Sequence, residues 1–118
     1  MQKVELEIKE QPHTYLWTHR RDDETGNLCQ WSLPLSHPLE SWGDVYNDRG
    51  YYGVCQPQIL PLLGGRSTIE VLARMLCESE TAGSAIVRRT ADSVGDGALS
   101  DRQWRQLLHD GYSDELSS

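Results

Sequence analysis

Three side chains between residues 37 and 44 carry groups that could do acid–base chemistry. His37 lies three residues before Glu40, and Asp44 follows four residues later. A histidine beside a carboxylate can relay a proton or anchor a ligand, and two carboxylates can act as general acid and base. In a loop, however, the same residue types most simply bond backbone N–H groups and fix a corner of the chain. We therefore name His37, Glu40 and Asp44 as the catalytic candidates, and we expect structural roles for all three.

A second candidate is the run Gly64-Gly65-Arg66-Ser67, which leads into a predicted helix. Backbone N–H groups at the start of a helix favour anions, so a phosphate cradle is conceivable there. The sequence lacks the Walker pattern, and a Gly-Gly turn before a capped helix needs no ligand to explain it. We expect a turn at this position.

The residue types that bind metals are dispersed along the chain. They are His13, His19, His37, His109, Cys29, Cys55 and Cys77. They show neither the paired histidine spacing nor the C-x-x-C spacing of zinc sites, and an odd number of cysteines makes no disulfide framework. Iron–sulfur clusters also need clustered cysteines. We predict no metal and no cofactor in this chain.

Composition limits the possible classes of function. The net charge of −7 over 118 residues argues against nucleic-acid binding, which needs a clustered basic face. No apolar run approaches the roughly 20 residues of a membrane span, and the charged N-terminus is not a secretory signal. The chain has no Phe, so four Trp and five Tyr must supply the aromatic bulk. Because these rings carry polar groups that need partners when buried, we expect a thin and partly polar core.

Period-2 patterns and turn residues predict a small mixed sheet. Val4, Leu6 and Ile8 alternate with charged residues, which is typical of a strand with one solvated face. Asn47 and Gly50 bound a turn of the kind that joins two strands of a hairpin. The predicted strands are residues 4–8, 14–19, 30–35, 44–46 and 51–55.

Two capping boxes predict helix starts. In each pair, Ser67 with Glu70 and Ser100 with Gln103, the two side chains bond backbone N–H groups at the beginning of the helix. Residues 81–92 indicate a weaker helix, because small residues interrupt its apolar pattern. The fold class that follows is α/β: one small sheet that includes the hairpin, with two or three helices packed on one face. We expect a single subdomain over residues 1–118, with its motifs in 22–76 and a helical tail in 81–112.

A longer pattern extends over the motif-rich part of the chain. It consists of Asp23-Glu24-Thr25, Cys29-Gln30-Trp31, Leu33-Pro34, His37-Pro38-Leu39-Glu40, Ser41-Trp42-Gly43-Asp44, Gln56-Pro57, the residues 59–62 and Gly64-Gly65-Arg66-Ser67. This pattern resembles the segment that closes the large domain of molybdopterin oxidoreductases. It is most similar to the iron–sulfur/molybdopterin-like subunit of the quinol-oxidising alternative complex III. Tyr51 departs from the family, because Arg is common there in cofactor-binding members, and residues 1–20 match less clearly.

The resemblance implies a parent protein that is larger than this chain. Such a parent is an oxidoreductase subunit, exported by a twin-arginine signal to the periplasmic face of the cytoplasmic membrane, where it assembles with quinol-oxidising membrane subunits. It carries iron–sulfur clusters in another region and has lost its molybdopterin. This chain is then a fragment that carries no export signal and no cofactor, is inactive by itself, and does not insert into the membrane. Its partners are the other segments of the parent chain.

Two alternatives remain open at this point. The chain could belong to a true cofactor-bearing molybdopterin oxidoreductase whose cofactor contacts lie partly here. It could also be a protein-binding module, with the hairpin and Trp42 as the contact surface, since Trp42 lies in a loop between Ser41 and Gly43.

Overall fold

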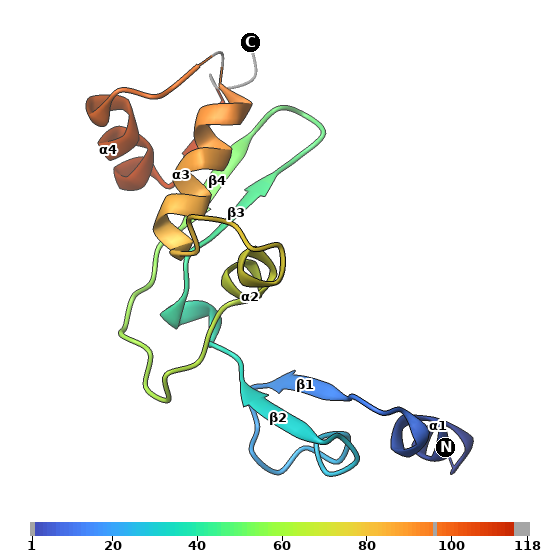
Figure 1. Ribbon diagram of the computed structural model, residues 1–118. Helices are drawn as coiled ribbons and strands as arrows, with labels where there is room; N and C mark the ends of the chain where they lie inside the picture. The colour runs from blue at the N-terminus through green and yellow to red at the C-terminus, as the bar shows by residue number, and fades with distance from the viewer. Residues whose placement is uncertain (1, 96, 115–118) are drawn as a thin grey trace.

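The fold is a mixed α/β arrangement of two small sheets and several helices, and the computed structural model describes residues 2–95 and 97–114 of it. The molecule is elongated, with principal dimensions of 52 × 28 × 28 Å. One sheet lies near the N-terminal end of the long dimension, and the other lies with α3 and α4 at the opposite end (Figure 1). The single sheet expected from the sequence is therefore divided in two.

The first sheet pairs β1 (Tyr15–Thr18) with β2 (Trp31–Pro34) in parallel. The register places Tyr15 beside Trp31 and Thr18 beside Pro34. Pro34 ends the strand, as a residue without an N–H donor does. Both strands were predicted within one or two residues of their observed ends.

The second sheet is antiparallel and has the order β3 (Gly43–Tyr46), β4 (Tyr52–Cys55) and β5 (Tyr112–Ser113). The hairpin between β3 and β4 confirms the turn prediction. The side-chain Oδ1 of Asn47 accepts hydrogen bonds from the N–H groups of Arg49 and Tyr51, and Gly50 closes the turn at φ +88°. A positive φ of this kind suits glycine, which has no Cβ to clash with the backbone.

The helices begin where the capping boxes predict. Ser67 caps α2 (Thr68–Met75) and Ser100 caps α4 (Asp101–Asp110), each with its side chain accepting from a backbone N–H. Gly111 ends α4 in the left-handed region at φ +79°. A short 3-10 helix, η1 (Pro38–Glu40), precedes the hairpin.

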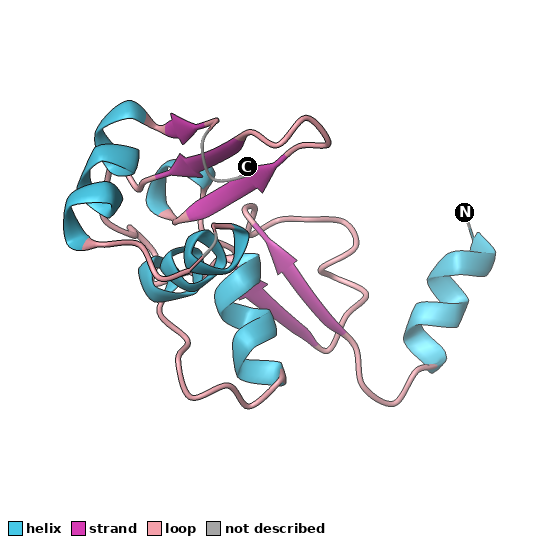
Figure 2. Cartoon of the chain, turned by 90° about the horizontal axis from the view of Figure 1, so that it is seen from above, coloured by secondary structure: helices cyan, strands magenta, loops and turns pink. Residues whose placement is uncertain are grey.

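The core lies between the hairpin, α3 (Gly83–Val94) and α4. Its buried members are Tyr52 and Val54 of β4, Val87 and Ala91 of α3, and Leu107 of α4. Figure 2 shows the three strands of the second sheet beside the C-terminal helices, far from the N-terminal helix. The helix α3 is continuous, whereas the sequence predicted that small residues weaken it. Gly83 lies in its first turn and so does not interrupt it.

One secondary-structure prediction is wrong. Residues 4–8 were expected to form a strand, but they lie in the helix α1 (Gln2–Glu10). The helix contains three Glu and two Lys, which are strong helix formers, and Glu5 and Lys9 have the i,i+4 spacing that stabilises a helix. A strand needs a hydrogen-bonded neighbour, and β1 pairs with β2 instead.

The fold is loose for its length. Its radius of gyration is 17.7 Å, against roughly 13 to 14 Å for a compact domain of this many residues. Its accessible surface is 8931 Å², whereas a folded monomer of this size exposes roughly 6,500 Å². About 2,400 Å² of additional surface is therefore open to solvent. Over residues 2–95 and 97–114, the structure has no helix with the length and apolar character needed to cross a membrane.

Candidate functional site

The first two catalytic candidates form the cap of η1. The Nδ1 of His37 accepts a hydrogen bond from the N–H of Leu39 at 3.2 Å, and Glu40 Oε2 accepts from the N–H of His37 at 3.2 Å. The other carboxylate oxygen of Glu40 accepts from the N–H of Leu62 at 3.3 Å. Both side chains thus bond backbone groups of the corner, which is the simpler of the two roles considered from the sequence.

The third candidate, Asp44, faces a different partner. Its Oδ2 accepts a hydrogen bond of 2.7 Å from the phenol of Tyr52, whose oxygen also lies 3.2 Å from the backbone carbonyl of Val87. Tyr52 is completely buried. Burial raises the pKa of Tyr52 well above its ordinary value, and the hydrogen bond to the Asp44 carboxylate raises it further. The phenol therefore remains a neutral donor at every physiological pH.

The three candidates do not share a site. A hollow of about 360 Å³ lies between η1, residues 57–61 and the start of α2, and Glu40 lines it. A second hollow of about 360 Å³ contains Asp44, together with His19 and Cys55. His37 lies beside His19, with ring centres 6.0 Å apart and an edge-to-face orientation. The arrangement supports a corner of the fold. Residues 2–95 and 97–114 show no nucleophile held by a base at this place, so we derive no catalytic step from it.

Residues 64–67, where a phosphate cradle was considered and a turn was expected, form a turn with a close backbone contact. The Oε2 of Glu70 accepts from both the N–H and the hydroxyl of Ser67, so the start of α2 is occupied by its own cap. A Cβ added at Gly65 would lie 3.0 Å from the backbone nitrogen of Ser36. The glycine therefore allows two backbone segments to touch, since Ser36 N–H bonds the Arg66 carbonyl at 3.1 Å.

The described residues contain no group of three or more His, Cys, Asp or Glu side chains placed to hold a metal ion. The cysteines are free thiols: Cys29 is half-buried, and Cys55 and Cys77 are exposed. Cys77 has a positive φ of 55° just after α2. This geometry matches the end of a helix, where the Cys77 N–H bonds the Arg74 carbonyl at 3.1 Å.

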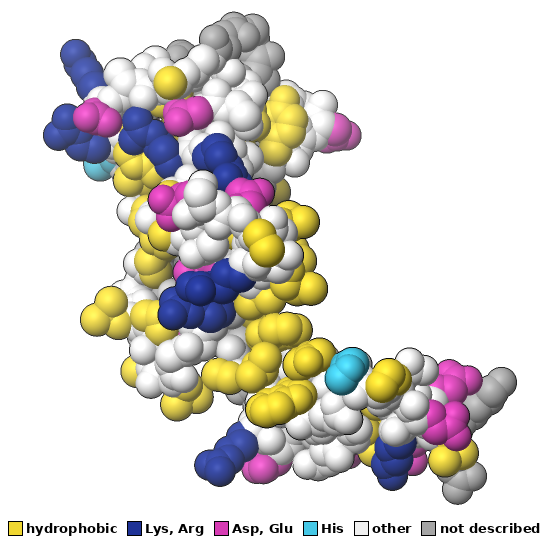
Figure 3. Space-filling model, in the orientation of Figure 1, with side chains coloured by type: hydrophobic (Ala, Val, Ile, Leu, Met, Phe, Trp, Pro, Cys, Tyr) yellow, Lys and Arg dark blue, Asp and Glu magenta, His cyan; other side chains and the backbone are white. Residues whose placement is uncertain are grey.

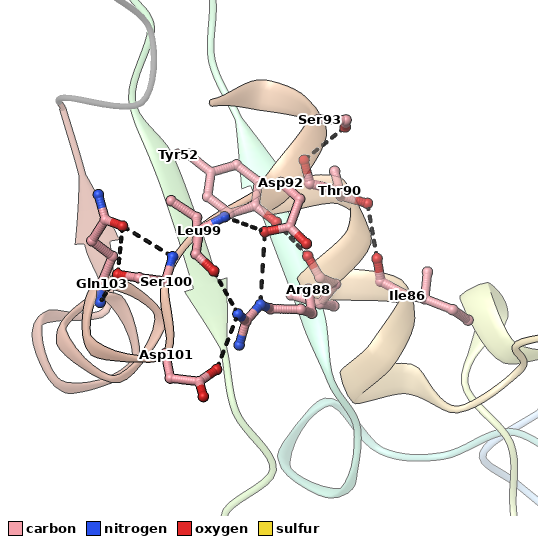
Figure 4. Close-up of polar contacts among 11 residues, drawn as sticks. Tyr52, Ile86, Arg88, Thr90, Asp92, Ser93, Leu99, Ser100, Asp101 and Gln103 are labelled. Atoms are coloured by element: carbon pink, nitrogen blue, oxygen red, sulfur yellow. Dashed lines mark hydrogen bonds and ion pairs between the residues drawn. The ribbon is translucent and has the colours of Figure 1, made fainter. Parts of the chain in front are cut away.

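Arg88 joins the two C-terminal helices through a polar network that the sequence did not indicate (Figure 4). Its guanidinium donates to the Leu99 carbonyl at 2.7 Å and lies 3.7 Å from the carboxylate of Asp92 on α3. Asp92 in turn accepts from the Leu99 N–H at 2.8 Å. The Arg88 guanidinium also lies 5.0 Å from the ring centre of Trp104. Leu99 and Trp104 lie beyond the end of α3 and approach Arg88 only in the folded chain, so their contacts with it could not be predicted from the sequence.

Trp42 was considered, together with the hairpin, as the contact surface of a protein-binding module. Trp42 is half-buried and packs against the core, with its ring stacked on Trp104 at 6.4 Å between centroids. A Cβ at Gly83 would lie 3.2 Å from the Cβ of Trp42, so the start of α3 also rests on this residue.

Apolar side chains are instead exposed on two neighbouring parts of the chain. We call these the exposed apolar set: Ile59, Leu60, Leu62 and Leu63 of the loop before α2, and Leu72, Met75 and Leu76 at the end of α2. The exposed fractions reach 84% at Leu60 and 80% at Leu63. Figure 3 shows hydrophobic side chains gathered over α2 and over the loop that precedes it. A soluble monomer seldom leaves so many large apolar side chains in contact with water.

Comparison of the chain with protein-family models found no match, and comparison with curated protein sequences found none either.

Proposed function

We propose that this chain is a non-autonomous subdomain of a molybdopterin oxidoreductase-like redox subunit. It serves as scaffold in a membrane-associated quinol-oxidising electron-transfer complex of the alternative complex III type, on the periplasmic face of the membrane. It does not bind the cofactor itself and is catalytically silent in isolation. Its partners are other segments of the parent chain and the quinol-oxidising membrane subunits.

The observation that carries the proposal is the position of the exposed apolar set. All of its members lie in residues 59–76, inside the segment whose motifs resemble the family. Burying one leucine side chain contributes about 1.5 to 3 kcal/mol, so leaving several in water is costly for a free-standing domain. A covering segment from the parent chain removes that cost. The structural roles of His37 and Glu40 agree with a scaffold, because both side chains bond backbone groups.

The reading frame that encodes the chain gives the first test. Coding sequence that continues past Ser118 into a region rich in C-x-x-C motifs supports the proposal, and a stop codon directly after Ser118 contradicts it.

Metal analysis and visible absorption of the purified parent distinguish a scaffold without the cofactor from a cofactor-bearing enzyme. Stoichiometric molybdenum would show that the chain belongs to a true cofactor-bearing oxidoreductase.

Substitution of the exposed leucines tests the covering segment directly. Leu60→Ser and Leu63→Ser should leave the stability of the 118-residue chain unchanged, because both side chains are already in water. In the parent, each should lower the stability by about 1 to 3 kcal/mol, because the side chains are buried there. Leu6→Ser is the matched control, since Leu6 is 59% exposed on α1 and lies outside the segment of resemblance. Equal effects in the chain and in the parent would contradict the proposal.

A protein-binding module is the second candidate, and the outer edge of the hairpin, which pairs with no strand in the described part of the chain, favours it. Val45 is 62% exposed and Tyr46 is 54% exposed on β3, the outer strand of the second sheet. Such an edge can accept a strand from a partner. A pull-down with the purified chain and with Val45→Asp distinguishes this function: a partner lost in the variant supports the module.

A further inference from the structure

The outer edge of β1 carries backbone groups with no partner in the described part of the chain. In the parallel ladder, Leu16 and Thr18 direct their N–H and C=O groups toward β2, as the bond from Leu35 N–H to the Thr18 carbonyl at 3.0 Å shows. Tyr15 and Trp17 therefore direct theirs away from β2. In Figure 1, β1 forms the upper edge of the first sheet, and seen from above nothing is drawn over it (Figure 2).

This edge has little of the usual protection against pairing. Natural edge strands carry Lys, Pro, bulges or inward charges that prevent another strand from adding. Residues 11–19 contain no Asp, Glu, Lys or Arg, although a quarter of the chain is charged. Pro12 precedes β1 and leaves the donors of the strand itself intact. Two-stranded parallel sheets are also marginal alone, so an added strand would stabilise this one.

The sequence of the edge indicates which strand adds. From residue 13 to residue 19 it reads His-Thr-Tyr-Leu-Trp-Thr-His, which is a palindrome of side-chain types centred on Leu16. An isologous dimer interface requires that residue i face residue j of the other copy while j faces i. Antiparallel pairing of two β1 strands about Leu16 places Tyr15 opposite Trp17 and Thr14 opposite Thr18. Aromatic pairs and Thr–Thr pairs are favourable across strands.

We propose that β1 is a homodimerisation edge, on which a second copy of this chain adds its own β1 to form a four-stranded sheet in the order β2-β1-β1-β2. Tyr15 and Trp17 of opposite copies exchange N–H···O=C hydrogen bonds, and their rings form one aromatic cluster on a single face. Within one copy these rings already stack at 6.4 Å between centroids. The inference rests on residues 13–19 and is independent of the proposed function.

Sedimentation equilibrium of the 118-residue chain tests the proposal, with two proline variants as a matched pair. Tyr15→Pro removes an outward N–H at the first residue of a strand, where proline is tolerated, and it leaves the β1–β2 ladder intact. We expect it to raise the dimer dissociation constant about tenfold or more, because each dimer loses two inter-copy hydrogen bonds. Ser32→Pro removes an outward N–H from the opposite edge and should leave the constant unchanged within about twofold. Tyr15→Phe should retain the dimer.

Amide hydrogen exchange of the unmodified chain gives a readout that needs no variant. In the dimer, the N–H groups of Tyr15 and Trp17 should be protected as strongly as those of Leu16 and Thr18. Dilution should remove the protection of Tyr15 and Trp17 and lower that of Leu16 and Thr18 by less, because these two N–H groups keep their bonds to β2 in the monomer. A chain that stays monomeric at the highest concentration overturns the proposal. A dimer in which Tyr15 and Trp17 exchange freely, or a monomer in which they are protected, overturns it as well.

Discussion

The indole ring of Trp42 stacks on that of Trp104, with centroids 6.4 Å apart and ring planes inclined by 20°. The contact joins the entrance of the hairpin to α4, and Arg88 of α3 lies 5.0 Å from the same Trp104 ring. Since Gly83 also rests on Trp42, this pair of rings links three elements that are distant in the sequence.

Gly83→Val should destabilise the chain by about 1 to 3 kcal/mol. The new Cβ would lie 3.2 Å from the Cβ of Trp42, an atom that cannot move without its backbone. Urea unfolding measures the loss, and the near-ultraviolet circular dichroism of the stacked indoles should change with it. Gly43→Val is the control, because a Cβ at Gly43 meets nothing within 4 Å. Equal stability of the two variants would show that the Trp42 contact does not restrict position 83.

Tyr52→Phe should cost about 1 to 2 kcal/mol of stability. It removes the donor to Asp44 while keeping the buried ring, so the loss reports the hydrogen bond. Chemical denaturation at neutral pH gives the difference. Tyr51→Phe alters a neighbouring phenol that is 46% exposed, and it should change stability by less than about 0.5 kcal/mol. A neutral Tyr52→Phe would mean that Asp44 is equally well solvated without the phenol.

Alkaline pH should destabilise the fold through Tyr52. Folding raises the pKa of this phenol above its ordinary value of about 10, so above that pH the unfolded chain releases a proton that the folded chain keeps. The contribution is complete below pH 10 and declines as the pH rises further, with a slope of at most about 1.4 kcal/mol per pH unit. Denaturant midpoints between pH 9 and pH 11 measure the slope. The Tyr52→Phe chain should show a smaller slope, and an unchanged one would assign the effect to other groups.

Arg88→Met should lower stability by about 1 to 2 kcal/mol, because it leaves the Leu99 carbonyl without its charged donor. The ion pair with Asp101 adds little, since that carboxylate is 86% exposed. Arg88→Lys should recover only part of the loss, because an ammonium cannot reproduce the planar fork that reaches Leu99 and Asp92 together. Thermal unfolding of the three chains ranks them.

The neighbouring Arg89→Met is the control for position 88. Arg89 pairs with Glu78, but its side chain is 55% exposed, so the cost should stay below about 1 kcal/mol. A larger loss at Arg89 than at Arg88 would contradict the role given to the Arg88 network.

Local signals in the sequence predicted the parts of the fold that depend on neighbouring residues. The capping boxes of Ser67 and Ser100 are confirmed, because each satisfies backbone donors only three residues away. The turn from Asn47 to Gly50 is confirmed for the same reason. His37 and Glu40 are three residues apart, so their capping role was also accessible to sequence reasoning.

The remaining features depend on partners that are distant in the sequence. Alternation at residues 4–8 suggested a strand, but no neighbouring strand pairs there, and helix propensity decided the conformation. The strand β5 has two residues, Tyr112 and Ser113, which is too short to show any period. The burial of Tyr52 arises only when β4 packs against α3, and the contacts of Arg88 with Leu99 and Asp101 arise only when the start of α4 comes close to α3.

Gly65 has a genetic consequence. The backbone of Ser36 lies so close that a Cβ at position 65 would clash with it. Two hydrogen bonds also join the segments here, from the Arg66 N–H to the Pro34 carbonyl and from the Ser36 N–H to the Arg66 carbonyl. A glycine codon changes to that of a residue bearing a Cβ by most single-base substitutions at its first two positions. One nucleotide can therefore alter how the N-terminal sheet is attached to the rest of the molecule while leaving every residue of the core unchanged.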